Sequence, residues 1–207
     1  MKVTGISREK GHTVKVIFEN GENIVLDLDF CTQKCIHEGD DITPKEIKDY
    51  LSESDYIRAK SRALWLLDRY EYTERRLFEK LKAAGFSASP SAKALARLKE
   101  LGLIDDSALS LRYAEECARR GISKREAYAK LYQKGFSGET VKKAIDGTLF
   151  DERSQIKELL ERKYKSKLSA GETEKVYSAL IRKGFSYGAV RDMLKEYSHE
   201  LELNGED

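Results

Sequence analysis

The feature that most constrains the fold of this chain is a short phrase that occurs three times. The tetrapeptide Lys-Gly-Phe-Ser occupies 134–137 and 183–186, and a near copy, Ala-Gly-Phe-Ser, occupies 84–87. The glycines of successive copies are 50 and 49 residues apart. A period in this range is typical of tandem structural units that bury their faces against one another. The sequence therefore predicts a repeat protein.

Each copy has the pattern of a helix end followed by a sharp corner. A leucine lies four residues before each glycine, and a phenylalanine follows the glycine directly. If the glycine is the left-handed residue that ends the helix, the leucine and phenylalanine side chains touch in a Schellman cap. The predicted caps consist of Leu81, Gly85 and Phe86, of Leu131, Gly135 and Phe136, and of Leu180, Gly184 and Phe185. The competing interpretation makes the phenylalanines a socket for a partner.

A serine follows each phenylalanine and can accept hydrogen bonds from the N–H groups that open the next helix. In the first copy, Ser89-Pro90 is the stronger start signal, because proline is favoured at the first helical position. Each phrase therefore predicts a helix, a corner and a second helix.

The beginning of the chain differs in kind from the rest. Val14, Val16 and Phe18 alternate with polar residues, and Asn20-Gly21 follows. Asn-Gly between two such runs is a strong hairpin signal, because both residues accept a positive φ. Further on, Thr43 and Glu46 flank Pro44 in the order of a helix start with a capping box. A small antiparallel sheet of two or three strands should therefore precede the helices.

The predicted fold is mainly α, with tandem three-helix repeats that form an elongated curved array behind a small N-terminal β-hairpin or sheet. Apolar residues at helical spacing mark the buried stripes, for example Leu66 and Tyr70 in the first repeat. We expect a β-hairpin extension at 1–42, a connecting helix at 43–54, three-helix repeats at 55–105, 106–147 and 148–198, and an acidic tail at 199–207.

Charge is distributed unevenly along the chain. The formal net charge is +2, yet residues 55–150 alone carry +7, between segments of −4 and −1. A local excess of this size favours a polyanion or an acidic protein surface as partner. The alternative is a set of solvated helix faces.

The opening "MKVTGISREKGH" lacks the long apolar core of a signal peptide, and no stretch approaches 18 apolar residues. The three cysteines do not form a disulfide framework of the secreted kind. We therefore expect a cytoplasmic protein that does not contact membranes.

Few residues suggest catalysis or metal binding. Cys31, Cys35 and His37 have ligand-type side chains, but a second pair of ligands is missing, so small packing residues are the preferred interpretation. Asp105 and Asp106 are adjacent and suit a helix start better than an acid–base pair. No phosphate loop or catalytic triad is recognisable. We expect no enzyme activity, no cofactor and no metal.

The aromatic residues of the first repeat allow two interpretations. Trp65 and Tyr70 lie five residues apart on one predicted helix. Such residues more often belong to a core or its rim than to a base-stacking platform, since single-strand binders usually carry these aromatics on sheets.

Two stretches of text resemble the RecX family of bacterial regulators of the RecA recombinase. They are "AKSRALWLLDRYEYTERRLFEKLKAAGF" and "LKELGLIDDSALSLRYAEECARRGISKREAYAKLYQKGF". The resemblance is strong over about residues 55–147, weaker in the third repeat, and does not cover the hairpin. Leu109 stands where the family usually has an aromatic residue. The matching positions are Ala63, Leu64, Arg69, Thr73, Leu77, Leu81, Gly85, Leu101, Gly102, Asp105, Asp106, Tyr113, Arg119 or Arg120, Gly121, Leu131, Lys134 and Gly135.

This resemblance implies a protein that is not an enzyme and that binds the RecA nucleoprotein filament. It implies altered filament growth, ATP hydrolysis and strand exchange in DNA repair and recombination, with inhibition as the expected direction. We expect a monomer with weak, non-specific affinity for single- or double-stranded DNA. The cations that we expect to contact the partner or DNA are Arg69, Arg75, Arg76, Arg112, Arg119, Arg120, Lys124, Arg125 and Lys134.

A second hypothesis is direct DNA binding through helix-turn-helix corners, because short glycine-containing turns join the predicted helices. The helices after the corners offer few arginine, asparagine or glutamine side chains for reading bases, which counts against it. A structural or adaptor role is the third possibility.

Overall fold

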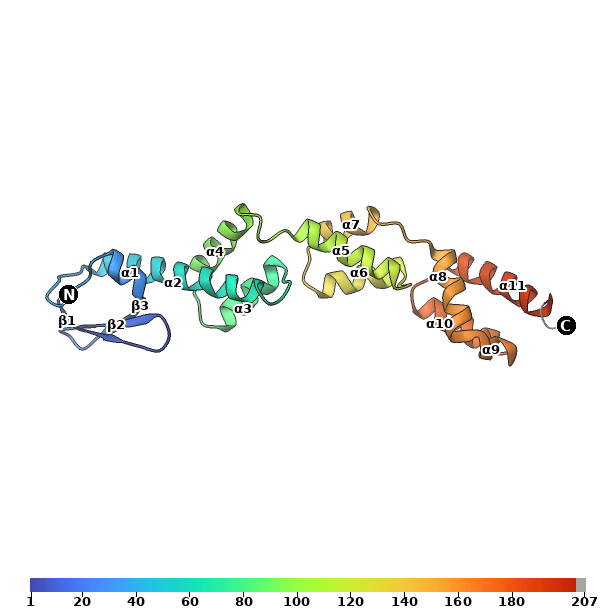
Figure 1. Cartoon of the computed structure of the whole chain (residues 1–207), viewed down its shortest axis with the longest axis horizontal. Coiled ribbons are helices and arrows are strands. Elements are labelled where there is room, and N and C mark those ends of the chain that lie inside the picture. Colours follow the sequence, from blue (N-terminus) through green and yellow to red (C-terminus); the bar gives the residue numbers. More distant parts are fainter. Residues whose placement is uncertain (204–207) are drawn as a thin grey trace. The chain divides into compact units, whose positions relative to one another are not determined.

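The computed structural model describes the backbone of residues 1–203 and the side chains of residues 1–199. The chain is mainly helical, with a small sheet at its N-terminus, as predicted (Figure 1). It divides into two compact units, residues 1–105 and residues 106–207. No helix within the described range is both long enough and apolar enough to cross a membrane.

The first unit begins with a three-stranded antiparallel sheet in the order β1-β2-β3. Its strands are β1 (Val3–Arg8), β2 (Thr13–Phe18) and β3 (Asn23–Asp27). The alternation in β2 buries Val14, Val16 and Phe18 on one face, as a period of two requires. These side chains form a core with short helix α1 (Leu28–Gln33) and the start of helix α2 (Pro44–Leu67).

The turn between β2 and β3 differs from the predicted type. The N–H of Phe18 donates to the carbonyl oxygen of Glu22 at 2.9 Å, which leaves a three-residue loop. Gly21 has a φ of 82°, whereas Cys35 is the sole non-glycine residue of the described chain with a positive φ. A longer loop with one left-handed glycine therefore replaces a two-residue turn in which Asn20 would also be left-handed.

Helix α2 starts at the predicted capping box. Thr43 Oγ1 accepts from the backbone N–H of Glu46 at 3.2 Å, and the Glu46 carboxylate accepts from the backbone N–H of Thr43 at 2.8 Å. From there α2 runs 24 residues without interruption, contacting β3 and then the helices of the first repeat. One continuous helix thus spans both the predicted connecting helix and the first helix of the repeat.

The first repeat combines the second half of α2 with α3 (Glu74–Ala83) and α4 (Ala88–Glu100). Its core contains Ala59, Ala63, Leu77, Leu81 and Leu98, each with no exposed surface.

Two sequence expectations for the first repeat were wrong. Helix α4 starts after Ser87 rather than at Ser89-Pro90, and Pro90 is tolerated because the first turn of a helix needs no donor there. The side chain of Tyr70 does not join the core, since it is 63% exposed beyond the end of α2.

The second unit contains the other two repeats, each with its own core. Helices α5 (Asp106–Arg119), α6 (Lys124–Gln133) and α7 (Gly138–Asp146) bury one cluster that includes Leu131, Phe136 and Val141. The third repeat buries a cluster that includes Ile156 and Leu180. Its first helix is interrupted by a π-helical turn. Its segments are α8 (Glu152–Leu159), the π-helical turn η1 (Leu160–Tyr164), α9 (Lys165–Ser169), α10 (Thr173–Arg182) and α11 (Tyr187–Leu203).

The predicted acidic tail begins inside α11, which continues to Leu203. Residues 204–207 lie outside the described residues. The helical segments of the third repeat therefore include the start of the predicted tail.

The repeated phrase forms helix caps. Gly85, Gly135 and Gly184 have φ values of 91°, 97° and 91°. The N–H of Phe86 donates to Leu81 O at 3.2 Å, and that of Phe185 donates to Leu180 O at 3.3 Å, as in a Schellman motif. Phe136 and Phe185 are buried and Phe86 is half-buried. The phenylalanines therefore have a structural role in the corners.

Candidate functional site

The nine cations predicted to contact a partner fall in both units. Arg69 lies just beyond α2, and Arg75 and Arg76 lie on α3. The remaining six belong to the second unit, on or next to α5 and α6. They are Arg112, Arg119, Arg120, Lys124, Arg125 and Lys134.

Trp65 lies between two arginines on the surface of the first unit. The guanidinium carbons of Arg62 and Arg69 are 4.3 Å and 4.0 Å from the centre of its ring. Arg69 Nη1 also donates to the backbone carbonyl of Trp65 at 3.1 Å. The Trp65 side chain is nevertheless 44% exposed, so it belongs to the rim rather than the core. We call Arg62, Trp65 and Arg69 the arginine–tryptophan stack.

More aromatic and cationic side chains lie in the segment that follows α2. Tyr70 and Tyr72 meet edge to face with ring centres 6.1 Å apart, and Lys80 Nζ lies 5.3 Å from the centre of the Tyr72 ring. Tyr72 is half-buried against the core of the first repeat, whereas Tyr70 is exposed and its ring can stack on a base or on a planar side chain of a partner.

On α3, two arginines share one carboxylate. Arg75 Nε lies 3.1 Å from Glu79 Oε1, and Arg76 Nη1 lies 3.2 Å from Glu79 Oε2. The Glu79 carboxylate therefore holds both arginines on the surface of α3. Exposed ion pairs of this kind contribute only ~0–1 kcal/mol, so a phosphate or carboxylate of a partner can replace them at little cost.

The second unit repeats this arrangement at the end of α5. Arg119 and Arg120 both pair with Glu116, the second at 3.8 Å. On α6, Lys124 Nζ lies 3.1 Å from Asp146 Oδ1 of α7. Lys134 Nζ is 4.1 Å from the centre of the Tyr113 ring.

Two exposed cations on α6 and α7 have no ionic partner among the described residues. Arg125 on α6 and Lys142 on α7 are exposed, and neither takes part in an ion pair or hydrogen bond among the described side chains. Arg112 is exposed on α5. The structure thus separates the predicted cations into a group around Trp65 and α3 and a group around α5 and α6.

Arg62 and Lys142 were not among the cations predicted from the sequence. Arg62 lies three residues before Trp65 and Arg69 four residues after it, a spacing that places all three on one helix face. The sequence therefore contained a signal for the stack. The position of Lys142 depends on the packing of α7, for which the sequence gives no local signal.

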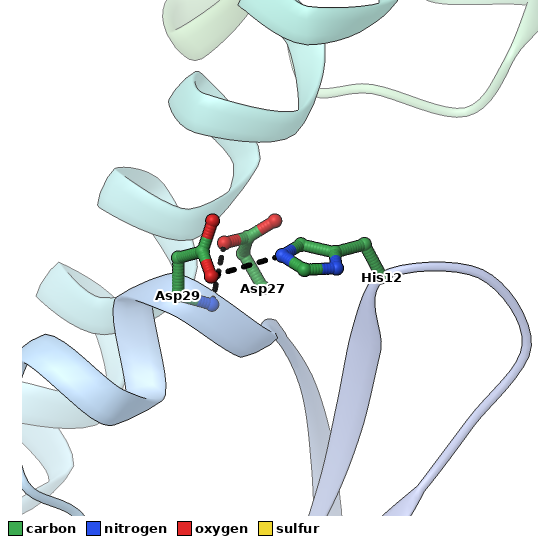
Figure 2. Close-up of side chains that lie close together, drawn as sticks. All are labelled: His12, Asp27 and Asp29. Atoms are coloured by element: carbon green, nitrogen blue, oxygen red, sulfur yellow. Dashed lines mark hydrogen bonds and ion pairs between the residues drawn. The ribbon is translucent and has the colours of Figure 1, made fainter.

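His12, Asp27 and Asp29 approach one another next to the sheet, with their nearest nitrogen and oxygen atoms within 4.8 Å (Figure 2). Asp27 caps α1, since its Oδ1 accepts from the N–H groups of Asp29 at 3.0 Å and Phe30 at 3.2 Å. His12 Nε2 lies 3.0 Å from Asp29 Oδ1. A helix cap and a surface contact between His12 and Asp29 account for this group. Within the described chain, Cys31, Cys35 and His37 do not form a comparable cluster.

The surroundings of Cys31 and of Asp106 indicate structural roles for both residues. Burial raises the pKa of the Cys31 thiol to about 11, and the negative charge of Asp27 adds to the shift. A thiol with a raised pKa is a poor nucleophile and a poor metal ligand at neutral pH. Asp106 occupies the first turn of α5, where the helix dipole favours a carboxylate.

Comparison with known proteins gives consistent relatives. No family model matches the chain. A protein named regulatory protein RecX from Caldanaerobacter subterraneus is 27% identical over 180 residues, covering 87% of this chain and 91% of its own length. A protein of the same name from Clostridium tetani is 27% identical over 203 residues and covers 94% of both chains.

Two solved structures share the fold. A crystal structure of regulatory protein RecX has a TM-score of 0.67 and 22% identity, and the match covers 94% of this chain and 98% of that one. RecX from Lactobacillus salivarius has a TM-score of 0.62 and 19% identity, over 69% of this chain and 96% of that one. The sequence relatives match over most of this chain, and together with the shared fold they support the RecX family of regulatory proteins.

Proposed function

We propose that this protein regulates RecA by binding to RecA filaments on DNA, and that it inhibits their ATP hydrolysis and strand exchange. The observation that carries the proposal is the match to regulatory RecX proteins over nearly the whole chain. The family is one of regulators, and we infer that the protein acts by binding, as a monomer in the cytoplasm, rather than by catalysis.

The surface chemistry supports a partner that combines phosphates with acidic protein. Pairs of arginines share one glutamate at two places, Glu79 on α3 and Glu116 on α5. These exposed ion pairs are weak, so each place can release its arginines to a stronger anion. A duplex or single strand supplies phosphates, and binding then weakens steeply with salt because counterions are released.

The first test is the DNA-dependent ATPase of RecA from the same organism, measured on single-stranded DNA while this protein is added. We expect the rate to fall at well below one copy per RecA, with no effect when DNA is omitted. An unchanged rate together with no co-sedimentation on filaments would contradict the proposal. Tight, sequence-dependent protection of duplex DNA would favour a helix-turn-helix binder instead.

A charge reversal locates the contact surface. Changing Arg119, Arg120, Lys124 and Arg125 to Glu should abolish filament binding and leave the helical circular dichroism signal unchanged. The matched control changes four cations of η1 and α9 in the third repeat. These cations are Arg162, Lys163, Lys165 and Lys167. Equal loss in both variants would show a general charge effect, and wild-type binding in the first would remove this surface from the proposal.

A further inference from the structure

The second and third repeats meet through polar contacts. Gln155 Nε2 on α8 donates to the backbone carbonyl of Ala118 at 2.9 Å, and Ser123 Oγ donates to the backbone carbonyl of Lys183 at 2.5 Å. The apolar clusters of the two repeats remain separate. The joint between them is therefore not filled by a shared core.

A groove of about 640 Å³ lies at this joint. Ile145, Phe150 and Tyr128 supply much of its wall, which is mostly apolar, and Tyr128 is 41% exposed. A groove of this size accommodates one bulky side chain with the backbone on either side of it. We call this the inter-repeat groove.

The charges at the inter-repeat groove do not cancel. Lys124 is paired with Asp146 at 3.1 Å. The Glu152 carboxylate is held by Ser186, accepting from its backbone N–H at 2.5 Å and from its hydroxyl at 2.7 Å. Arg125 and Lys142, which also line the groove, have no such partner among the described residues. A carboxylate that enters the groove can therefore pair with both cations, because neither has to break an existing ion pair.

The groove also contains a buried acceptor. Gln155 lines it, is 7% exposed, and its Oε1 has no hydrogen-bond partner among the described side chains. The amide cannot simply be turned over, because its Nε2 already donates to Ala118 O. The oxygen itself has less than 1 Å² of exposed surface, so Gln155 belongs to the floor of the groove rather than to its polar contacts.

We propose that the inter-repeat groove binds a peptide segment of a partner protein in which a carboxylate lies next to a bulky apolar side chain. The apolar side chain packs against the wall formed by Tyr128, Ile145 and Phe150. The carboxylate pairs with Arg125 and Lys142. This inference does not depend on RecA, since it rests on the chemistry of the groove alone.

Nucleic acid fits the groove less well than a peptide. A phosphate chain would lie close to Asp146 and Glu152 as well as to the two cations. Sites that follow a phosphate backbone use grooves lined by positive charge, whereas this one is largely apolar. One apolar anchor beside one charge is the pattern by which proteins read short peptide motifs.

The test uses the full-length protein without RecA and a fluorescein-labelled peptide, Asp-Glu-Phe-Leu-Asp-Glu. Its controls are the peptide with Ala in place of Phe-Leu, the peptide with Lys in place of each acid, and a short oligothymidylate. We expect saturable binding of the first peptide only. Nuclear magnetic resonance should show shifts of the Gln155 side-chain amide and of Tyr128 when this peptide is added.

Matched variants decide between the groove and general charge attraction. Arg125→Ala with Lys142→Ala should weaken the peptide about tenfold or more, because charge-assisted hydrogen bonds are lost. Lys143→Ala is the control, since Lys143 is also exposed on α7 but pairs with Glu139 and does not line the groove. Equal weakening in both, or no saturable binding, would overturn the proposal. Displacement of the peptide by oligothymidylate, with tighter binding of the nucleotide, would overturn it in favour of nucleic acid.

Discussion

The hydroxyl of Ser123 donates a 2.5 Å hydrogen bond to the carbonyl oxygen of Lys183, sixty residues further along the chain. Ser123 also caps α6, since its Oγ accepts from the N–H of Glu126 at 3.2 Å. One hydroxyl thus joins the start of a helix in the second repeat to the corner of the third. That corner is the site of the first prediction.

Replacing Gly184 by alanine should destabilise the protein more than replacing Gly85. Both have a φ of 91°, so both variants incur the left-handed cost of ~1–2 kcal/mol. At Gly184 the new Cβ would also lie 2.9 Å from Ser123 Oγ and 3.0 Å from Arg125 Cβ, whereas nothing lies within 4 Å at Gly85. Crowding of this kind adds about 1–3 kcal/mol. Urea unfolding followed by circular dichroism measures the difference, and equal losses would contradict the close approach.

The arginine–tryptophan stack can be tested through fluorescence, because Trp65 is the only tryptophan of the chain. Changing Arg62 and Arg69 to Ala should make acrylamide quench the emission more strongly, since the two side chains cover the ring. The stability should fall by about 1 kcal/mol or less, as expected for exposed cation–π contacts. Arg75→Ala, which removes a cation paired with Glu79, is the control. Unchanged quenching would show that the arginines do not cover the ring in solution.

The three thiols should react in two classes. Cys35 is exposed, whereas Cys31 and Cys117 are buried and burial raises the pKa of each. For Cys31, the rise from 9.0 to about 11 lowers the thiolate fraction near pH 8 about a hundredfold. A thiol reagent should therefore modify Cys35 rapidly. It should modify Cys31 and Cys117 only when the protein unfolds locally or globally. Three equal rates would contradict the burial.

The same pKa shift predicts a loss of stability at high pH. Above pH 9 the unfolded chain releases the Cys31 proton, while the folded chain retains it up to about pH 11. The unfolded state then binds fewer protons, so the free energy of unfolding decreases as pH rises through this window. The melting temperature between pH 8 and 10.5 measures the decrease. Cys31→Ala should reduce the slope, and an unchanged slope would mean that other groups cause it.

The group of His12, Asp27 and Asp29 in Figure 2 can be tested as a helix cap or as a metal site. Asp27→Ala should cost about 1–2 kcal/mol, because Asp27 is 5% exposed and its carboxylate caps α1. Asp27→Asn should cost less, since the amide oxygen still accepts. Asp29→Ala should change stability by under about 0.5 kcal/mol, because its side chain is exposed. A melting temperature raised by zinc and restored by a chelator would contradict the cap as the full explanation.

The local parts of the fold could be predicted because their causes are local. A Schellman cap needs only the residues from Leu81 to Phe86, and the capping box needs only those from Thr43 to Glu46, so sequence spacing is sufficient. The turn at Asn20 and the start of α4 were assigned less well. There, one extra loop residue or a serine two positions earlier satisfies the same local rules.

The surfaces were harder to predict because they depend on packing between distant segments. Gln155 and Ala118 are 37 residues apart and meet only when two repeats are assembled, so neither carries a local signal. Trp65 is an intermediate case, since its spacing from Arg62 and Arg69 was visible but its exposure was not. The ion pair between Lys124 and Asp146 joins two helices and likewise carries no local signal.

The four apolar clusters have a consequence for how the chain is made. Their buried residues span 3–42, 59–104, 109–145 and 156–197 and follow one another without overlap, and half-buried residues of α2 up to Ile57 complete the first cluster. Every core is complete once its own last residue has left the ribosome, and local contacts of this kind form quickly. A nascent chain can therefore fold one module after another, and little apolar surface waits exposed for segments that have not yet been synthesised.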